Sequence, residues 1–405
     1  MQIPPDMPVF EGECADNELV TDTDESDVLK IDTFDKLDEL LYTAGKHDLA
    51  AIRKVNFIYN VDDNHLDKEQ ELCTARFLGA LPQLQTLRLD QTRYWQDSGY
   101  WRLPASKAMG QLLQRAITEA SARSFGELKT IIWGAYTNLL DEMLPLWGLP
   151  VEHIEVSVRE PVAWSHEPWP APNPSLKRLN LHSSAIEHST LEKLLRLSPC
   201  LEVLRYHHLC NVNAVPQQWP QDGSLLMTAL RQVQSTLVEL DLSMYLYSEY
   251  AEEVEDLMYV FPVSGQLGPL QEFSRLRKLK APIATLLGWS PNKLLPLAKV
   301  VPTGLTYLGL TENLLTQETS EWHEEFVLKE LAAFLSVWKT VTPDLQVIEV
   351  WLTLARWFDP EMTQMRKMCE EAQESGLLII VHHREESAGT CSLKTFHWVR
   401  SGLTV

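Results

Sequence analysis

The segment LKRLNL at residues 176–181 is followed 25 residues later by LEVLRY at residues 201–206. Both fit the pattern L-x-x-L-x-L, with an aromatic residue accepted at the last position. Alternation at the fourth and sixth positions places two side chains on one face of a short strand and turns the intervening residue to the other face. A single copy would carry little weight, because any Leu-rich amphipathic helix can contain one by chance. Its recurrence along the chain decides the fold.

The same six-residue pattern, with Ile, Val, Ala or an aromatic in place of Leu, returns over most of the sequence. Ten copies cover residues 52–57, 84–89, 128–133, 151–156, 176–181, 201–206, 237–242, 276–281, 305–310 and 345–350, and a last strand-like run covers 377–381. Successive copies lie 23 to 44 residues apart. The shorter spacings match the ~20–29 residues of a leucine-rich repeat, and the longer ones predict repeats that carry insertions.

Segments with helical periodicity separate these strands, at residues 67–81, 104–124, 188–197 and 325–338. In the third of them, Ser189 and Thr190 precede an apolar stripe that starts at Leu191 and predict a helix N-cap. Alternating strands and helices predict an α/β leucine-rich-repeat solenoid, a horseshoe with a curved parallel sheet on its concave side and helices on its convex side. The competing fold is a doubly wound sheet, but such a sheet usually carries a Gly-rich ligand loop after a strand, and none is found.

Charge is distributed unevenly along the chain. The 405 residues include 56 acidic and 35 basic side chains, for a formal net charge of −21, and residues 1–40 hold 13 of the acidic side chains but only Lys30 and Lys36 as basic ones. Such a segment repels itself and has little to bury. We predict a disordered acidic tail over residues 1–30, a capping helix region over 31–50, a solenoid of about ten irregular repeats over 51–382, and a C-terminal cap over 383–405.

Several classes of protein are disfavoured by composition. The acidic balance argues against a nucleic-acid partner, because phosphate recognition needs concentrated Lys and Arg. Six cysteines without paired spacing predict neither a disulfide framework nor a zinc knuckle. The N-terminal residues lack the features of a secretory signal, and no apolar run reaches the ~18 residues of a membrane span. We therefore expect an intracellular protein, cytoplasmic or nuclear, with no membrane partner.

At the start of the repeat region, a short helical stretch with Leu37, Leu40 and Leu41 leads into residues 49–57, where Val55 and Phe57 begin the repeat pattern. This arrangement resembles the start of the repeat domain in fungal F-box proteins with irregular leucine-rich repeats. The resemblance covers about residues 32–381 and implies a substrate-receptor-like scaffold. F-box receptors also carry an N-terminal helical box that docks to a ubiquitin-ligase adaptor, and residues 1–30 do not resemble it. A lost or divergent box, or one missing from the chain, remains the alternative.

Candidate metal and catalytic groups do not form a known motif. His207 and His208, near Cys210, are adjacent on a strand and must point to opposite faces. His382 and His383 with Cys391 and His397 pose the same difficulty, and surface or hydrogen-bonded histidines explain both groups better. The acidic run at residues 22–27 lacks the turn glycine and final Glu of a calcium loop. No nucleophile elbow, dinucleotide or phosphate-binding loop occurs, so we predict no cofactor, no metal and no enzymatic activity.

Tryptophan-rich insertions are a further candidate for binding. Trp95 and Trp101 lie in residues 91–103, and Trp164 and Trp169 lie in the proline-rich residues 161–174. Aromatic side chains on irregular loops beside a rigid scaffold can act as contact anchors. They can equally cover exposed edges of the solenoid, and the sequence favours neither role.

Outward positions of successive strands should line the concave face and give it a mixed charge. The predicted partner-binding residues are Arg88, Arg178, Asn180, His182, Arg205, His207, Glu239 and Asp241, with Asp90, His153, Glu155, Lys278 and Lys280 on the same face. Adjacent strands are ~4.8 Å apart, so we expect Arg178 and Arg205 to be neighbours. The leading hypothesis is a non-catalytic scaffold that binds a protein or peptide there. A ubiquitin-ligase substrate receptor, and an enzyme with a site built between the insertions, are the alternatives.

Overall fold

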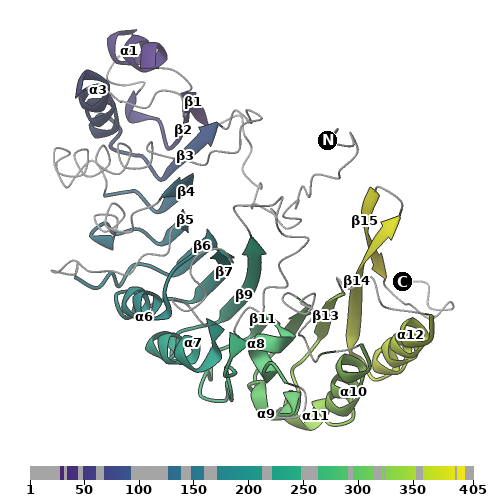
Figure 1. Ribbon diagram of the computed structural model, residues 1–405. Helices are drawn as coiled ribbons and strands as arrows, with labels where there is room; N and C mark the ends of the chain where they lie inside the picture. The colour runs from purple at the N-terminus through teal and green to yellow at the C-terminus, as the bar shows by residue number, and fades with distance from the viewer. Residues whose placement is uncertain are drawn as a thin grey trace, which may run out of the picture.

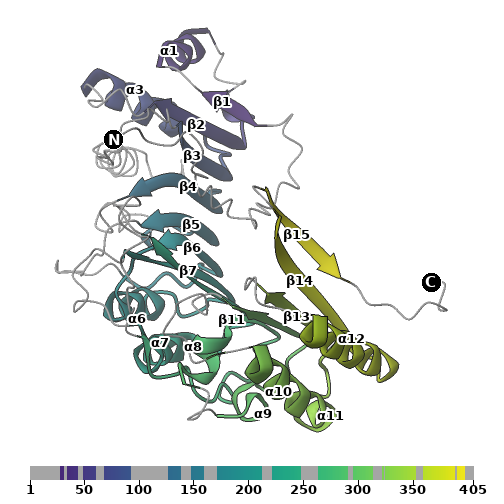
Figure 2. The same ribbon diagram turned by 45° about the vertical axis from the view of Figure 1, so that its right-hand side comes forward.

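The computed structural model describes residues 28–31, 34–43, 49–60, 68–92, 126–137, 147–158, 171–211, 221–247, 263–290, 295–312, 322, 324–352, 359–387 and 390–396. These residues form an arc of strands with helices along its outer side (Figures 1 and 2). The architecture is a leucine-rich-repeat-type α/β solenoid with an open sheet, which confirms the predicted fold class.

The sheet runs through the whole arc. Its thirteen strands follow chain order, apart from β8 and β10, which pair with each other elsewhere. The strands are β1 (Leu29–Ile31), β2 (Lys54–Asn60), β3 (Thr86–Thr92), β4 (Thr130–Thr137), β5 (His153–Val158), β6 (Arg178–Ser184), β7 (Val203–Asn211), β9 (Glu239–Tyr247), β11 (Lys278–Pro282), β12 (Tyr307–Thr311), β13 (Val347–Leu352), β14 (Leu378–Ser387) and β15 (Thr390–Phe396). All neighbouring pairs are parallel except β14 with β15, which closes the C-terminal end as an antiparallel hairpin.

Helices cover the outer face of the sheet (Figure 2). The described helices are α1 (Phe34–Thr43), α3 (Lys68–Gly79), α6 (His188–Arg196), α7 (Gly223–Leu230), α8 (Ile283–Leu287), α9 (Leu297–Val300), α10 (Glu324–Leu335), α11 (Trp338–Val341) and α12 (Asp359–Glu374), with a 3-10 turn at Arg231–Val233. Among the helices of the described ranges, none combines the length and the apolar character needed to cross a bilayer.

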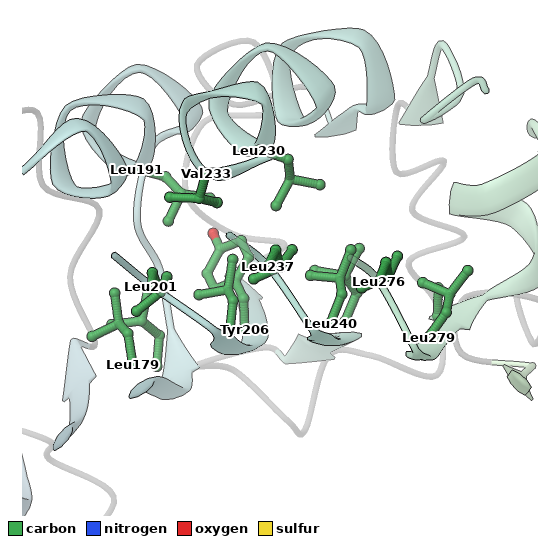
Figure 3. Packing of buried hydrophobic residues seen from close by; sticks show 14 of the residues in the cluster. Leu179, Leu191, Leu201, Tyr206, Leu230, Val233, Leu237, Leu240, Leu276 and Leu279 are labelled. Carbon is green, nitrogen blue, oxygen red and sulfur yellow. The ribbon is translucent and has the colours of Figure 1, made fainter. Parts of the chain in front are cut away.

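The predicted repeat positions form one continuous core. Every residue at the fourth and sixth positions of the ten copies is buried, and so is every first-position residue except the partly buried Ile52. The fourth positions also align across the sheet: Leu179 pairs in register with Leu204, Leu204 with Leu240, and Leu240 with Leu279. The side chains of Leu179, Leu240 and Leu279 point toward the side of the sheet where Leu191 and Leu230 lie on the helices (Figure 3). Burial of this ladder is the main favourable term in folding.

Strand register is fixed by a backbone contact that recurs between repeats. The carbonyl of Glu152 accepts hydrogen bonds from the amides of Lys177 and Arg178, at 2.9 and 3.0 Å. The carbonyl of Lys177 does the same for Glu202 and Val203, at 2.8 and 2.9 Å. Because each strand starts from such a shared acceptor, repeats of unequal length can stack in one register.

Several predicted ends of helices and segments differ from those in the structure. Leu29 and Lys30, assigned to the acidic tail, belong to β1, because Leu29 pairs with Val55 and extends the sheet by one strand. Helix α6 begins at His188, and its N-cap is Glu187, which makes no side-chain cap. Ser189 and Thr190 therefore lie within the first turn and are not the N-cap. The predicted helix at 325–338 is divided into α10 and α11. Residues 1–27 and 104–124 lie outside the described residues.

A small parallel pair, β8 (Gln221–Asp222) with β10 (Val263–Ser264), holds the start of α7 against the next repeat. Asp222 caps α7, because its carboxylate accepts hydrogen bonds from the amides of Ser224 and Leu225 at 2.8 and 3.4 Å. Gly223 follows, and a Cβ there would lie 2.5 Å from the backbone of Gln266. Only glycine fits this close backbone approach.

Replacing Gly223 with Ala should therefore force the backbone at Gln266 to move and disrupt the β8–β10 pair. We expect a loss of about 1–3 kcal/mol in the free energy of unfolding, the usual cost of overpacking, measured by urea denaturation. Gly79→Ala is the matched control, because a Cβ at Gly79 meets nothing within 4 Å. Equal stability of the two variants would contradict the close approach.

Candidate interaction surface

The sheet face opposite the helices forms the inner side of the arc (Figure 1). All eight predicted binding residues lie on strands at positions between core residues: Arg88 on β3, Arg178, Asn180 and His182 on β6, Arg205 and His207 on β7, and Glu239 and Asp241 on β9. Their placement on this face agrees with the repeat pattern. Whether they bind a partner stays a prediction.

The strand register changes the expected arrangement of Arg178 and Arg205. Arg178 pairs directly with Val203, and Arg205 pairs with Asn180, so Arg178 and Arg205 are diagonal rather than side by side. The Arg205 guanidinium turns to the next strand and donates two hydrogen bonds to one carboxylate oxygen of Glu239, at 3.1 and 2.9 Å. The ammonium of Lys278 lies 3.8 Å from the other oxygen of Glu239. Opposite charges thus alternate across β7, β9 and β11.

A hydrogen-bonded group on β5 and β6 continues this surface. The Asn180 side-chain amide donates to Glu155 at 3.2 Å and lies 3.4 Å from His153 Nε2. His182 Nε2 is 3.5 Å from the other oxygen of Glu155. Burial acts to raise the pKa of Glu155, but the hydrogen bonds from His182 and Asn180 outweigh it and leave the pKa below its ordinary value. Glu155 is therefore ionised at neutral pH.

His153 has a different electrostatic state. Its pKa is lowered to about 4, chiefly by burial; Glu155 acts to raise the pKa, whereas Arg178, Arg205 and His182 act with burial to lower it. Its imidazole is consequently neutral at neutral pH and acts as a hydrogen-bonding group in the sheet.

Asp241 on β9 is the acidic partner of His207. His207 Nε2 lies 4.0 Å from Asp241 Oδ2, and His207 Nδ1 lies 3.4 Å from His182 Nδ1. Burial acts to raise the pKa of Asp241, but His207, Lys280 and Arg205 outweigh it and lower the pKa. We define the central network as His153, Glu155, Asn180, His182, Arg205, His207, Glu239 and Asp241.

A second group lies on this face, and the sequence analysis anticipated only its Lys280. We call it the tryptophan cluster: Lys280, Tyr307, Glu349, Trp351 and His382. Trp351 stacks on His382 with ring centroids 4.9 Å apart and planes 14° apart. The Lys280 ammonium lies 4.1 Å from the centroid of Trp351. His382 Nε2 is 2.6 Å from Glu349 Oε1, and the Tyr307 hydroxyl donates to the other oxygen of Glu349.

The gap that brings Lys280 and Trp351 together is left by Gly309 on the intervening strand. A Cβ at Gly309 would lie 2.9 Å from Lys280 Cγ and 3.1 Å from Trp351 Cζ3. The outward positions of residues 345–350 and of the last strand-like run would have indicated Glu349, and one further step of alternation gives Trp351 and His382. Their mutual contact could not have been inferred, because it depends on a missing side chain on a third strand.

The adjacent histidines of β7 point to opposite faces, as their spacing predicts. His207 is partly exposed on the concave face, whereas His208 is buried. Among the described residues, no group of three or more His, Cys, Asp and Glu has the arrangement of a metal site. The side chains of Cys210, His383 and Cys391, together with His397, the acidic run at 22–27 and the four loop tryptophans Trp95, Trp101, Trp164 and Trp169, lie outside the described residues.

Comparison with solved structures adds a distant likeness in fold. Neither a family model nor a curated protein matches the chain. The leucine-rich repeat-containing protein LegL7 from Legionella pneumophila is similar in structure, with 12% sequence identity over 88% of this chain and 83% of that one, and a TM-score of 0.35. At that TM-score, the assignment of a leucine-rich-repeat fold rests on the register and burial of this chain's own repeats.

Proposed function

We propose that the protein is a non-catalytic interaction scaffold that binds a protein or peptide on its concave face. The observation that carries this proposal is the central network, a set of polar and charged side chains held in place across four adjacent strands. Apart from the buried Asn180, these residues are partly exposed. Their neighbours already orient them, so binding costs little side-chain ordering. Their alternating charges favour a partner with a complementary pattern.

The tryptophan cluster supplies the apolar contact that a polar surface alone would lack. Trp351 is partly exposed, and its ring is held between Lys280 and His382. Large aromatic side chains that are fixed in position dominate the binding energy of many protein interfaces. We therefore propose that a partner contacts both the central network and Trp351.

The test compares charge-reversing substitutions on the concave sheet face with charge-reversing substitutions on the outer, helical face. The concave variant combines Arg178→Glu with Arg205→Glu, and the control combines Lys193→Glu with Arg196→Glu on α6, where Arg196 forms an exposed pair with Glu192. Partners would be identified by affinity purification and mass spectrometry from the native cell, and their dissociation constants measured with purified proteins. We expect at least tenfold weaker binding for the concave variant and for Trp351→Ala, since interface hot spots contribute ~2 kcal/mol or more.

The control should bind within about twofold of the unmodified protein, because exposed ion pairs contribute little. Retention of every partner by the concave variant would remove this face from consideration. Equal losses in both variants would indicate a general electrostatic effect.

A ubiquitin-ligase substrate receptor is the second candidate function. The supporting observation is the order of α1 and β2, a short helix leading into the first repeat strands, in agreement with the resemblance noted in the sequence. The test is co-purification with a ligase adaptor, using the full coding sequence including any segment upstream of Met1. Absence of an adaptor from such complexes would eliminate this candidate and leave the scaffold proposal intact.

A further inference from the structure

One row of residues crosses neighbouring strands of the concave face from β5 to β13. Its members are paired in register from each strand to the next, through β6, β7, β9, β11 and β12. Carboxylates occupy the first, fourth and seventh positions of the row, and cations occupy the third and fifth. We call this set the charge row: Glu155, Asn180, Arg205, Asp241, Lys280, Gly309 and Glu349.

The three carboxylates of the charge row are all ionised at neutral pH. Burial acts to raise the pKa of each, but hydrogen bonds from neighbouring side chains and nearby positive charges outweigh it and lower the pKa. Within the described residues, no Lys or Arg forms an ion pair with any of them. The ion-pair partners there are histidines: His153 and His182 for Glu155 at 3.8 and 3.5 Å, His207 for Asp241 at 4.0 Å, and His382 for Glu349 at 2.6 Å.

The even spacing of these carboxylates distinguishes between conformations of a bound segment. Three strand spacings of ~4.8 Å separate one carboxylate position from the next, about 14 Å in all. Four residues of extended chain span about 13–14 Å, and side chains four residues apart point to the same side. One face of an α-helix recurs every ~5.4 Å, at about 11 or 16 Å, and misses this spacing. An extended segment laid across the strands therefore matches all three carboxylates.

The cations between the carboxylates restrict the other residues of such a segment. Arg205 pairs in register with Asp241 on one side, and Lys280 pairs with Asp241 on the other. A residue midway between two basic residues of the segment would lie beside one of these cations. An acidic side chain is favoured there, and a basic one is disfavoured by like-charge repulsion.

We propose that the partner presents an extended segment across the charge row, with Lys or Arg at every fourth residue opposite Glu155, Asp241 and Glu349 and an acidic residue midway between them. This inference rests on the proposed scaffold function and specifies the chemistry of the partner. Asp241 would be the central contact, because its Oδ1 atom is buried without a hydrogen-bond partner in the described part of the chain, and a donor from the segment would satisfy it. Trp351 lies two residues beyond Glu349 on β13, so the segment would meet the tryptophan cluster at that end.

Fluorescence anisotropy with a labelled nine-residue peptide and the full chain tests this proposal. The matched peptide has Lys at its first, fifth and ninth positions, Glu at its third and seventh, and Thr, which favours extended structure, at the others. The shifted peptide has the same composition, with Lys at its first, fourth and seventh positions and Glu at its third and ninth, so its lysines do not share one side. We expect the matched peptide to bind at least tenfold more tightly than the shifted peptide, because only its charges complement the row.

A double-mutant cycle isolates the central contact, since the central Lys faces Asp241 whichever way the matched peptide runs. Asp241→Asn should weaken binding of the matched peptide at least tenfold, because it leaves the cation of the peptide without its carboxylate. The same variant should change binding of a peptide with Thr in place of the central Lys by less than about twofold. Glu370→Gln on α12 is the matched control, because Glu370 forms an exposed pair with Arg366, and it should leave binding unchanged. Circular dichroism would verify that each variant is folded.

Three results would overturn the inference: no binding of the matched peptide, equal affinities of the matched and shifted peptides, or equal losses for the matched peptide and its Thr variant in Asp241→Asn. If native partners were then still lost by the Arg178→Glu/Arg205→Glu variant, the scaffold function would stand with a partner of different chemistry. If that variant kept every partner, both proposals would fall.

Discussion

Replacing Leu240 with Ala is expected to lower the free energy of unfolding by about 2–5 kcal/mol, the range for deleting a buried leucine side chain. Leu240 is fully buried in the middle of the repeat ladder, where it pairs with Leu204 on one side and Leu279 on the other. Figure 3 shows it within the row of apolar side chains beneath the helices. The smaller side chain would leave a cavity that neighbouring strands can only partly close.

Leu225→Ala on α7 is the matched control, because Leu225 is 52% exposed and the substitution makes the same chemical change on the outer surface. We expect it to cost less than about 0.5 kcal/mol. Urea denaturation followed by circular dichroism measures both variants. Similar losses for the two would contradict the assignment of Leu240 to the core.

The loss of stability caused by Leu240→Ala should also be largest in the strands next to β9. In a solenoid each repeat contacts only its neighbours, so stability is approximately a sum of repeat and interface terms. Amide hydrogen exchange is expected to accelerate most in β7, β9 and β11, and least in the distant β2 and β3. Uniform acceleration along the sheet would show that the array unfolds as a single cooperative unit.

The second large effect is acid sensitivity caused by buried histidines behind the sheet. His208 is buried beside Tyr206 and His188. The Tyr206 hydroxyl donates to the carbonyl of Ile186 at 2.9 Å and is in hydrogen-bond contact with His208 Nδ1, which is therefore the donor to Tyr206. Burial, with His188 adding to it, lowers the pKa of His208 to about 3, and burial lowers that of His188 to about 4 against the opposing effect of Asp222.

The direction of the pH effect follows from these values. A histidine in the unfolded chain binds a proton near its ordinary pKa of 6.5, whereas folded His208 does so only near pH 3. Between those values the unfolded chain binds more protons, so the free energy of unfolding falls as pH falls, by up to about 1.4 kcal/mol per pH unit for each such histidine. The stabilisation is complete above pH 6.5 and is lost progressively below it.

His208→Asn removes this titration while keeping a hydrogen-bonding group next to Tyr206. We expect the slope of unfolding free energy against pH, between about pH 6 and about pH 5, to be smaller by about 1 kcal/mol per pH unit than in the unmodified protein. Tyr206→Phe should lower stability yet keep the original slope, because His208 remains buried. Urea denaturation at several pH values gives both slopes. An unchanged slope in His208→Asn would mean that His208 is protonated in the folded protein.

The fold was predictable from the sequence because each position of the repeat indicates whether its side chain is buried or faces outward. In the segment LKRLNL, three leucines mark the side facing the helices, and all three are buried in the structure. The charged and polar residues between them mark the opposite face. Strand β1 escaped detection because it has only three residues, too few to show a period.

The candidate surface was predictable as a set of residues but not as a set of contacts. The repeat places Arg205 and Glu239 on the same face, and their ion pair was open to inference from it. The contact between Lys280 and Trp351 was not, because it crosses β12 and needs the space left by Gly309. The approach of His182 to His207 likewise follows an irregularity in the pairing of β6 with β7, between Leu181 and Ser184.

The amino-acid sequence by itself determined which residues form the interior of this solenoid and which line its inner face, because a side chain's direction on a strand depends only on its place in a two-residue alternation. Tertiary structure alone decided which of the inner-face side chains meet. Those neighbours come from repeats separated by segments of unequal length, and they are brought together by backbone register and by the room left on adjacent strands, neither of which is encoded within a single repeat.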